Sequence, residues 1–414
     1  MYRVSSNMSN DDFRYRMLRQ DNGISQLENK ISSSNRITNL RDDPVAAAHS
    51  TRLKSNITRM ERFERNIDYT KGRYNEVEGY MDETLNILHR LRELAVQGSN
   101  GTYGEEDREM MAVETNELLN QLVTVANTTS VDGRALFGGT DREGEPFEAF
   151  SSRIPKMQQP GITQVTYLGN IQENQVEIAE GSYVPVDFRG NDIFWSEHNQ
   201  LFGPRDVQDY VVQEDTAFTV DGVTVNLKAG DNINNIVDRI NGSTAAVKAE
   251  IDPVSGALNM KTTVAHQIWL DEPENATVLK DLGLITAVGK PPMNLGTDVA
   301  SSGGSLFDTI INMRDSLLNN DAEQVGGSVL AGLSSSMDTL LGKIADLGAM
   351  EERLDVTQNR LSKGVVDTQA WDSSLTDTDM TEAVTRLKMM EFVQQATYRA
   401  SSQIWDKSLM DFLR

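Results

Sequence analysis

The architecture is decided by residues 44–98, which read PVAAAHSTRLKSNITRMERFERNIDYTKGRYNEVEGYMDETLNILHRLRELAVQG. Every seventh residue of this stretch is apolar, and such a stripe is typical of a long helix that packs along its partners through a narrow seam. Asp42 or Asp43 can cap the start of this helix, and Pro44 suits the first turn because it has no N–H to leave unpaired. Gly98 ends the helix, which would span roughly 80 Å at 1.5 Å per residue. The stripe consists of Ala46, Leu53, Met60, Ile67, Tyr74, Met81, Leu88 and Ala95.

A second row beside this stripe is only partly apolar. Polar side chains interrupt it, so the sequence predicts a seam rather than a wide buried face. The row contains Phe63, Val77 and Leu91 together with Asn56, Thr70 and Thr84.

The C-terminal part of the chain repeats the seven-residue spacing. An intramolecular antiparallel bundle is one interpretation for the segments near 44–130 and 330–365, the first of which includes a shorter helix at about 105–128. The two terminal segments have thinner seams, and isolated helices are marginal in water. We therefore expect the termini to be disordered alone and to order when they pair with other chains, as in a subunit built to polymerise. The repeating residues are Leu333, Leu340, Leu347, Leu354 and Leu361 near the C-terminus, Met17, Ile24 and Ile31 in the first segment, and Met380, Ala383, Leu387, Met390, Ala396, Ala400 and Ile404 in the last.

The middle of the chain, about 131–304, has the alternating pattern and turn residues of antiparallel strands. A compact ββαββ module is expected at about 216–265, with its first hairpin turning at Asp221-Gly222. Ser301–Ser305, SSGGS, is expected to be a flexible linker that returns to the C-terminal helices.

These patterns predict an α+β fold, with a long α-helical coiled coil or bundle built from both termini and an inserted, mostly β outer region. We expect a helical rod domain formed by 44–139 together with 306–365, and a β-rich outer region at 140–305. Residues 1–43 and 366–414 are expected to be assembly helices that are disordered in the monomer.

Composition excludes several classes of protein. The chain has 39 Lys and Arg against 62 Asp and Glu, a net charge of −23, which argues against nucleic acid as a partner because a phosphate-binding surface must be basic. The chain contains no cysteine, so disulfides and thiol chemistry are excluded. No apolar run approaches the length of a membrane helix, so no membrane partner is expected, and residues 1–7 lack the apolar core of a secretory signal peptide.

No catalytic, cofactor or metal site is expected. His49, His89, His198 and His266 are scattered, without a second ligand at metal spacing, and no phosphate-binding loop or nucleophile elbow is present. Asp377-Thr378-Asp379 resembles half a calcium loop, but it precedes a helical run and is better interpreted as an N-terminal cap. We therefore predict that the chain is not an enzyme and needs no cofactor.

Short motifs stand near both ends of the chain. The first is Ile31-Ser32-Ser33-Ser34-Asn35-Arg36-Ile37, followed by Arg41-Asp42-Asp43-Pro44-Val45-Ala46-Ala47-Ala48. The others are Asn66-Ile67-Asp68, Arg92-Glu93-Leu94-Ala95-Val96-Gln97, Asn100-Gly101-Thr102, Gly133-Arg134-Ala135-Leu136-Phe137-Gly138-Gly139, Ser374-Leu375-Thr376-Asp377-Thr378-Asp379-Met380-Thr381-Glu382-Ala383, Gln395-Ala396 and Ser408-Leu409-Met410-Asp411-Phe412-Leu413. Together these motifs resemble the flagellin-like family, in particular its hook–filament junction members, the hook-associated proteins. Flagellin itself typically has Ala-Ala-Gly after the aspartate pair, and the family usually has Gly and Lys where this chain has Ser34-Asn35.

The resemblance implies a structural subunit of the bacterial flagellum, an adaptor on which the flagellin filament assembles. Its partners would be further copies of the chain in a ring-like layer, a neighbouring hook-associated protein on the hook side, flagellin or the next junction protein on the filament side, and an export chaperone. It would be secreted through the type III route to an external flagellum, or to a periplasmic one if the flagella are internal. A flagellin-type filament subunit and a coiled-coil scaffold are the alternatives.

The family resemblance and the heptad seam together predict an assembly interface formed by residues from both ends of the chain. A charge in that seam, as in Leu409→Asp, is expected to abolish incorporation of the subunit while sparing the β domain. The predicted interface residues are Met17, Ile24, Ile31, Arg36, Asp42, Asp43, Pro44, Met380, Leu387, Ala396, Ile404, Leu409 and Leu413.

Overall fold

The computed structural model describes residues 6–141, 144–157, 159–273, 275–286 and 289–410, with side chains described between residues 11 and 400 of these ranges. The chain divides into two compact units. The first unit joins Met1–Arg65 to Val356–Arg414, and the second unit is Asn66–Asp355.

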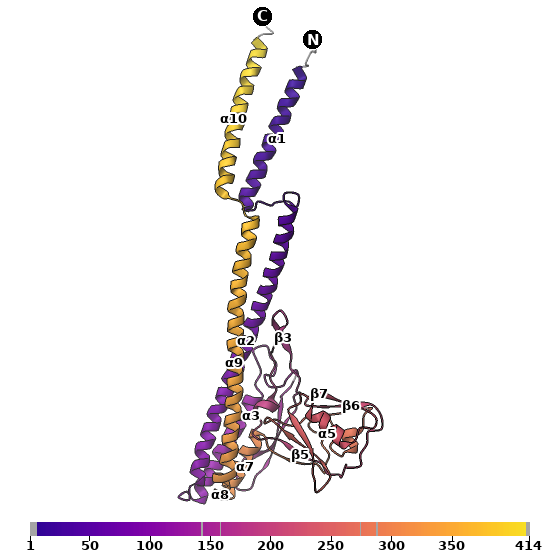
Figure 1. Cartoon of the computed structure of the whole chain (residues 1–414). Coiled ribbons are helices and arrows are strands. Elements are labelled where there is room, and N and C mark those ends of the chain that lie inside the picture. The colour runs from indigo at the N-terminus through magenta and orange to yellow at the C-terminus, as the bar shows by residue number, and fades with distance from the viewer. Residues whose placement is uncertain (1–5, 142–143, 158, 274, 287–288, 411–414) are drawn as a thin grey trace. The chain divides into compact units, whose positions relative to one another are not determined.

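Long helices from both ends of the chain and small sheets in its middle confirm the α+β class (Figure 1). The helix expected at 44–97 extends over Pro44–Ser99, and the helix expected at about 105–128 extends over Glu105–Ala126. The helices are α1 (Ser6–Ser33), α2 (Pro44–Ser99), α3 (Glu105–Ala126), α4 (Gly190–Ile193), α5 (Ile233–Asn241), α6 (Val278–Asp281), α7 (Leu306–Leu318), α8 (Ala322–Gln324), the π-helical η1 (Val325–Val329), α9 (Leu330–Thr376) and α10 (Met380–Met410).

The heptad stripe of α2 is buried in the second unit. Its side chains are at most 2% exposed there, and the leucine row of α9 is buried as well. At this spacing one face of each helix is continuously apolar, and burying that face supplies the main stabilisation of the helical part. The buried members are Ile67, Tyr74, Met81, Leu88 and Ala95 on α2 and Leu333, Leu340, Leu347 and Leu354 on α9.

The two threonines that interrupt the second row of α2 are also buried. Thr70 is fully buried and donates its hydroxyl to the carbonyl of Asn66 at 2.8 Å. Thr84 is 1% exposed and donates to the carbonyl of Tyr80 at 2.9 Å. Because each hydroxyl is satisfied by the carbonyl four residues earlier on its own helix, these threonines pack without leaving an unpaired polar group. The second row is therefore part of the core at both positions.

In the first unit, the beginning of α2 packs against the end of α9. Phe63 and Leu361 are buried, and Lys54 Nζ lies 3.7 Å from Asp372 Oδ2. A Cβ added to Gly364 would meet the sulfur of Met60 at 3.1 Å, which indicates close helix packing at this glycine.

The strands that the structure describes in the second unit form four small antiparallel sheets. Two are hairpins, β1 with β2 and β3 with β4, and the other two have the strand orders β10-β6-β7 and β11-β5-β9-β8. The strands are β1 (Phe147–Arg153), β2 (Pro160–Tyr167), β3 (Gln175–Ala179), β4 (Ser182–Pro185), β5 (Gln200–Phe202), β6 (Thr216–Val220), β7 (Val223–Leu227), β8 (Val247–Ile251), β9 (Leu258–Thr262), β10 (Leu270–Asp271) and β11 (Ala300–Ser302).

The expected ββαββ module is observed as β6, β7, α5, β8 and β9, over residues 216–262. Its first turn has Asp221 and Gly222 at φ of +49° and +77°, the two positive values that a type I′ hairpin requires. The amphipathic face of α5 lies between the two hairpins, and Ile233, Ile236 and Ile240 are at most 2% exposed. The two hairpins belong to different sheets, so one helix stabilises both through a shared apolar core.

The expectation of a flexible linker at Ser301–Ser305 is wrong. Ser301 and Ser302 lie in β11, which pairs with β5, and Gly303 adopts a φ of +88° that allows the chain to turn. Ser305 then caps α7, since its hydroxyl accepts from the Asp308 N–H at 3.1 Å and the Asp308 carboxylate accepts from the Ser305 N–H at 2.9 Å. Strand pairing and this capping box give the polar segment a defined structure.

Candidate assembly surface

The two ends of the chain form an antiparallel helix pair in the first unit, α1 with α10 (Figure 1). Backbone hydrogen bonds fasten the pair where α1 ends and α10 begins. The Arg36 N–H donates to the carbonyl of Thr376 at 2.7 Å, and the Thr378 N–H donates to the carbonyl of Ser34 at 2.9 Å. Asp379 Oδ1 accepts from the N–H of Thr381 at 2.9 Å, so the acidic run before α10 caps this helix as expected.

The packed face between α1 and α10 is thin. Ile24 is buried, whereas Met17, Ile31 and Leu387 are only half-buried. A helix pair joined by one narrow apolar seam gains little from burial.

Polar contacts complete the seam at its middle. The Gln20 side chain donates to the carbonyl of Met390 at 3.2 Å, and the Gln394 side chain donates to Asp21 Oδ1 at 2.5 Å. A Cβ on Gly23 would lie 2.7 Å from the end of the Met390 side chain, so the glycine allows the two helices to approach closely.

On each helix of the pair, large apolar side chains are exposed among the residues whose side chains the structure describes. On α1, Tyr15 and Leu18 are 65% and 62% exposed, and on α10, Met389 and Phe392 are 67% and 71% exposed. Large exposed apolar side chains are candidates for contact with another chain. Both helices of the pair therefore offer apolar surface for contact with another chain.

The turn between α1 and α2 is held by two aspartates. Asp43 caps α2, since its Oδ1 accepts from the Ala46 N–H at 3.0 Å, and Asp42 Oδ2 accepts from the Asn39 N–H at 3.1 Å. These backbone hydrogen bonds are the main cause that lowers the pKa of each carboxyl group. Arg36 lies 3.4 Å from Asp43, but the pair is exposed and contributes little to stability.

Ser34, which follows the last residue of α1, adopts a φ of +57°. This left-handed conformation is the usual C′ position of a helix, where glycine is preferred because it has no Cβ. The family's usual glycine at this position would fit the observed turn, and serine occupies it at a conformational cost.

The structure brings some of the predicted interface residues together and leaves others apart. Met17, Ile24, Ile31 and Leu387 lie on the face shared by α1 and α10, while Met380 and Ala396 are exposed on α10. Pro44 is the first residue of α2 and lies beside the turn that Arg36, Asp42 and Asp43 organise. Ile404 and Leu409 belong to α10, but their side chains, and Leu413 altogether, lie outside the described residues. The role of all thirteen residues in contacts between subunits stays a prediction.

Sequence reasoning missed the most exposed members of this surface, including Tyr15, Met389 and Phe392. These residues lie outside the heptad rows of α1 and α10, because each helix carries apolar side chains on a second face. The signal was present in the adjacent pair Met389-Met390, which points an apolar side chain toward each face.

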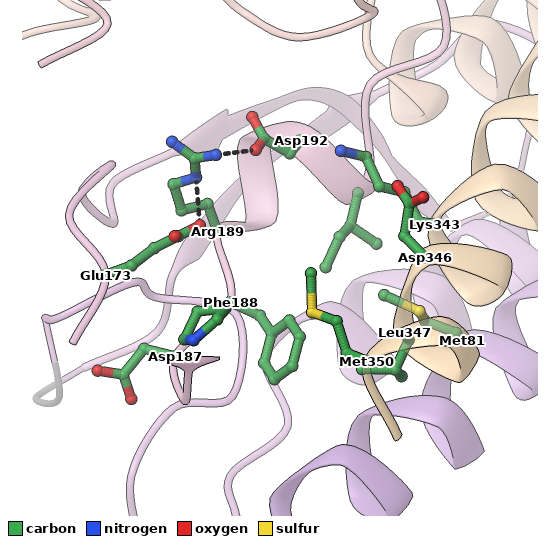
Figure 2. Close-up of a pocket in the computed structure, with 12 residues that line it drawn as sticks. Met81, Glu173, Asp187, Phe188, Arg189, Asp192, Lys343, Asp346, Leu347 and Met350 are labelled. Atoms are coloured by element: carbon green, nitrogen blue, oxygen red, sulfur yellow. Dashed lines mark ion pairs between the residues drawn. The ribbon is translucent and has the colours of Figure 1, made fainter. Parts of the chain in front are cut away.

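The second unit contains a pocket of about 270 Å³ between α9 and the segment before α4 (Figure 2). The Arg189 guanidinium lies 3.0 Å from Glu173 and 2.7 Å from Asp192, so these charges satisfy one another at the pocket's edge. Burial raises the pKa of Glu173, although the charge of Arg189 opposes the shift. The other lining residues are Met81, Pro185, Asp187, Phe188, Ile193, Lys343, Asp346, Leu347 and Met350. The ion pairs join Arg189 to Glu173 and Asp192 beside the pocket, and the lining residues include no nucleophile–base pair.

Within the described ranges, no group of three His, Asp or Glu side chains is placed to hold a metal ion. Of the helices described, none is both long and apolar enough to cross a membrane.

Comparison with known families gives three matches along the chain. Residues 4–142 match the bacterial flagellin N-terminal helical region, and residues 330–413 match the bacterial flagellin C-terminal helical region. Residues 211–264, which contain the whole ββαββ module observed at 216–262, match the flagellin hook IN motif. The two helical regions together cover more than half of the chain.

Similar individual proteins include Flagellin A of Vibrio anguillarum, which is 27% identical over 374 residues that cover 89% of this chain and 87% of the relative. Polar flagellin C of Vibrio parahaemolyticus is 26% identical over 404 residues, covering 95% of this chain and 94% of the relative. Among solved structures, the flagellar junction protein FlgL from Legionella pneumophila is 20% identical, with a TM-score of 0.46, over 79% of this chain and 99% of that chain.

Proposed function

Because this chain belongs to the bacterial flagellin family, we propose that it is the adaptor subunit at the hook–filament junction, of the hook-associated protein 3 type, on which the flagellin filament assembles. The family consists of structural proteins of the flagellum, so the chain is a structural subunit that assembles with other flagellar proteins and is not an enzyme.

One observation carries the assembly part of this proposal. Helices from the two ends of the chain pair through a thin seam and leave Tyr15, Leu18, Met389 and Phe392 largely exposed. A surface of this kind gains its stabilisation only when neighbouring subunits cover it. Repetition among many copies then makes an assembly much firmer than any single contact.

Two motifs favour a junction subunit over a filament subunit. The first is Pro44-Val45-Ala46, which follows the aspartate pair where flagellin itself typically has Ala-Ala-Gly. The second is the segment Leu136–Gly139, in which Phe137 is fully buried and Gly139, at a φ of +66°, lies against the carbonyl of Asn170. A Cβ at Gly139 would stand 2.4 Å from that oxygen, so the glycine is required where the helical rod passes into the β region.

In this role the subunit forms a ring-like layer with copies of itself. It contacts a neighbouring hook-associated protein on the hook side, and flagellin or the next junction protein on the filament side. The subunit is exported by the type III route with an export chaperone, to an external flagellum or a periplasmic one. The assembly contacts use the thirteen interface residues named above, together with the exposed outer face of α1 and α10.

Electron microscopy of cells that lack this gene tests the role, with flagellin assayed in the medium or periplasm. We expect completed hooks without filaments and flagellin released as monomer, both restored by the wild-type gene. Normal filaments would refute the junction role.

A flagellin-type filament subunit is the second candidate, because the similar flagellins match this chain over most of their length. The deletion distinguishes the two candidates. Loss of a filament subunit shortens or weakens filaments in proportion to its abundance, whereas loss of an adaptor removes them.

Limited proteolysis separates both candidates from a coiled-coil scaffold. We expect residues roughly 1–40 and 376–414 to be cut quickly in the dilute monomer while 50–360 survives, because the terminal seam is thin. Termini that resist cleavage in the dilute monomer would favour the scaffold.

A further inference from the structure

Three arginines on the first half of α2 form an exposed row in the first unit. Arg59, Arg62 and Arg65 follow one another at three-residue spacing, so they project from one side of the helix. Between residues 52 and 65, α2 carries five Lys and Arg against two Glu. Like charges at this spacing destabilise a helix, so an anionic partner would stabilise this arginine row.

The arginine row borders an open hollow of about 520 Å³, and none of the described residues that line this hollow carries a carboxylate. Arg59 donates to Oδ1 of Asn56 at 3.2 Å. The guanidinium of Arg62 lies 5.3 Å from the ring centroid of Phe63. These contacts orient the two side chains, and each guanidinium still has donors for a carboxylate because it carries five N–H groups. The other lining residues are Ser55 and Thr58.

The exposed face of α3, in the second unit, has the complementary chemistry. Its members are spaced four, three and four residues apart, which places them on one side of the helix. All of them are exposed, with Met110 at 62% and Val113 at 47%. The helix carries six Asp and Glu against one arginine, Arg108, which is buried. This acidic ridge consists of Glu106, Met110, Val113 and Glu117.

The charges of the two units favour a contact between unlike units of different copies. The first unit contains 19 Lys and Arg against 16 Asp and Glu, a net charge of +3, whereas the second contains 20 against 46, a net charge of −26. Two second units that face each other repel, whereas the first unit of one copy attracts the second unit of another. A contact between two different patches is heterologous, the kind that continues from copy to copy around a ring.

We propose that the arginine row of one copy binds the acidic ridge of a second copy. The guanidinium groups pair with the carboxylates of Glu106 and Glu117 at the two ends of the ridge, and the aliphatic stems of the arginines cover Met110 and Val113 between them. Exposed ion pairs are weak singly, so the contact becomes firm only when many copies repeat it. This inference rests on the proposed assembly of many copies and names a contact within it.

An engineered disulfide reports the contact directly, because the chain has no cysteine of its own. Ser55→Cys places a thiol in the hollow and Met110→Cys places one in the ridge, and neither removes a charge. The two purified full-length variants are mixed and oxidised mildly. We expect their mixed disulfide dimer to form about tenfold faster than that of Ser55→Cys with Val254→Cys, since Val254 is 93% exposed but lies outside the ridge.

Charge reversal measures the contribution of the ion pairs. Arg62→Glu with Arg65→Glu should weaken self-association about tenfold in sedimentation equilibrium at physiological ionic strength, and so should Glu106→Lys with Glu117→Lys. The chain that carries all four substitutions should recover the association, because each pair is restored with its signs exchanged. The lysine variant is less negative overall, so long-range repulsion alone would strengthen its association. Weakening in that variant therefore reports the local contact.

Arg360→Glu with Lys363→Glu is the matched control, because both side chains are exposed on α9 in the first unit and lie outside the hollow. This control should associate as the wild type does. The proposal is overturned if the wild type does not self-associate, if the mixed disulfide forms no faster than with Val254→Cys, or if the four substitutions together do not restore association. All of these measurements use the purified chain, so normal filaments in the deletion strain would refute the junction role without altering them.

Discussion

Replacing Phe392 by aspartate separates the stability of the subunit from its assembly. Phe392 is 71% exposed on the outer face of α10, so Phe392→Asp removes little buried surface from the chain itself. Substitutions at such exposed positions usually change stability by no more than about 0.5 kcal/mol. The monomer is therefore expected to unfold at nearly the wild-type temperature.

The cost arises when subunits associate. Full burial of a phenylalanine stabilises by about 1.5–3 kcal/mol, so covering the exposed 71% of Phe392 accounts for about 1–2 kcal/mol in each copy. The aspartate adds the penalty of burying an unpaired carboxylate, which is larger than the lost burial. Because every copy in the layer carries the same defect, assembly should fail even though each contact is modest.

The assay is complementation of the deletion strain, scored by filaments in electron micrographs and by flagellin released as monomer. Phe392→Leu should assemble normally, because it keeps an apolar side chain at the interface. Val254→Asp is the matched control, since Val254 is 93% exposed in the turn between β8 and β9 and outside the terminal helices. Normal filaments with Phe392→Asp would refute the argument that this face is covered on assembly.

Three further predictions concern the fold. Arg314 is 1% exposed and donates to Oδ1 of Asn116 at 3.1 Å. Arg314→Met would leave this buried acceptor unpaired and should lower the free energy of unfolding by about 2–4 kcal/mol. A loss below about 1 kcal/mol in urea titrations would contradict this expectation. Burial is the largest single influence on the pKa of His266 and lowers it, but the hydrogen bond to Asp221 at 2.8 Å and the charges of Asp221 and Asp192 together outweigh it, so the net pKa is raised. The stability that this pair contributes is thus complete below about pH 6.5 and is lost as the pH rises through the folded-state pKa of His266. In Asp221→Asn, the thermal unfolding midpoint should lack this fall with rising pH when it is measured at a series of pH values. Ser34→Gly should relieve the left-handed strain by about 1 kcal/mol and slow hydrogen exchange at the end of α1 about fivefold, whereas unchanged or faster exchange would show that the turn is not strained.

Local signals in the sequence were sufficient to predict individual helices and hairpins. The seven-residue spacing, the aspartate before Pro44 and the Asp221-Gly222 turn each depend on residues close together in the chain. They specified a helix, its cap and a hairpin that the structure contains. These devices act within one or two turns, so no knowledge of distant partners is needed to recognise them.

Pairing between distant segments could not be predicted in the same way. The hairpins of the ββαββ module were expected in the right order, but β6 pairs with β10 and β9 pairs with β5, outside the module. The segment Ser301–Ser305 looks like a linker by composition, yet its first two residues form a strand because they pair with β5, about a hundred residues earlier. Strand partners are chosen by packing of the whole unit, which composition does not contain.

The same distinction between local and long-range contacts applies to the candidate assembly surface. The sequence alone determined that both ends of the chain are helical, that they carry apolar seams, and that the chain resembles the flagellin family, because helical periodicity and short motifs are properties of neighbouring residues. Only the tertiary structure decided that Thr70 and Thr84 belong to the core and that Phe392 remains largely exposed. Burial depends on contacts between residues far apart in the chain, and those contacts exist only once the chain has folded.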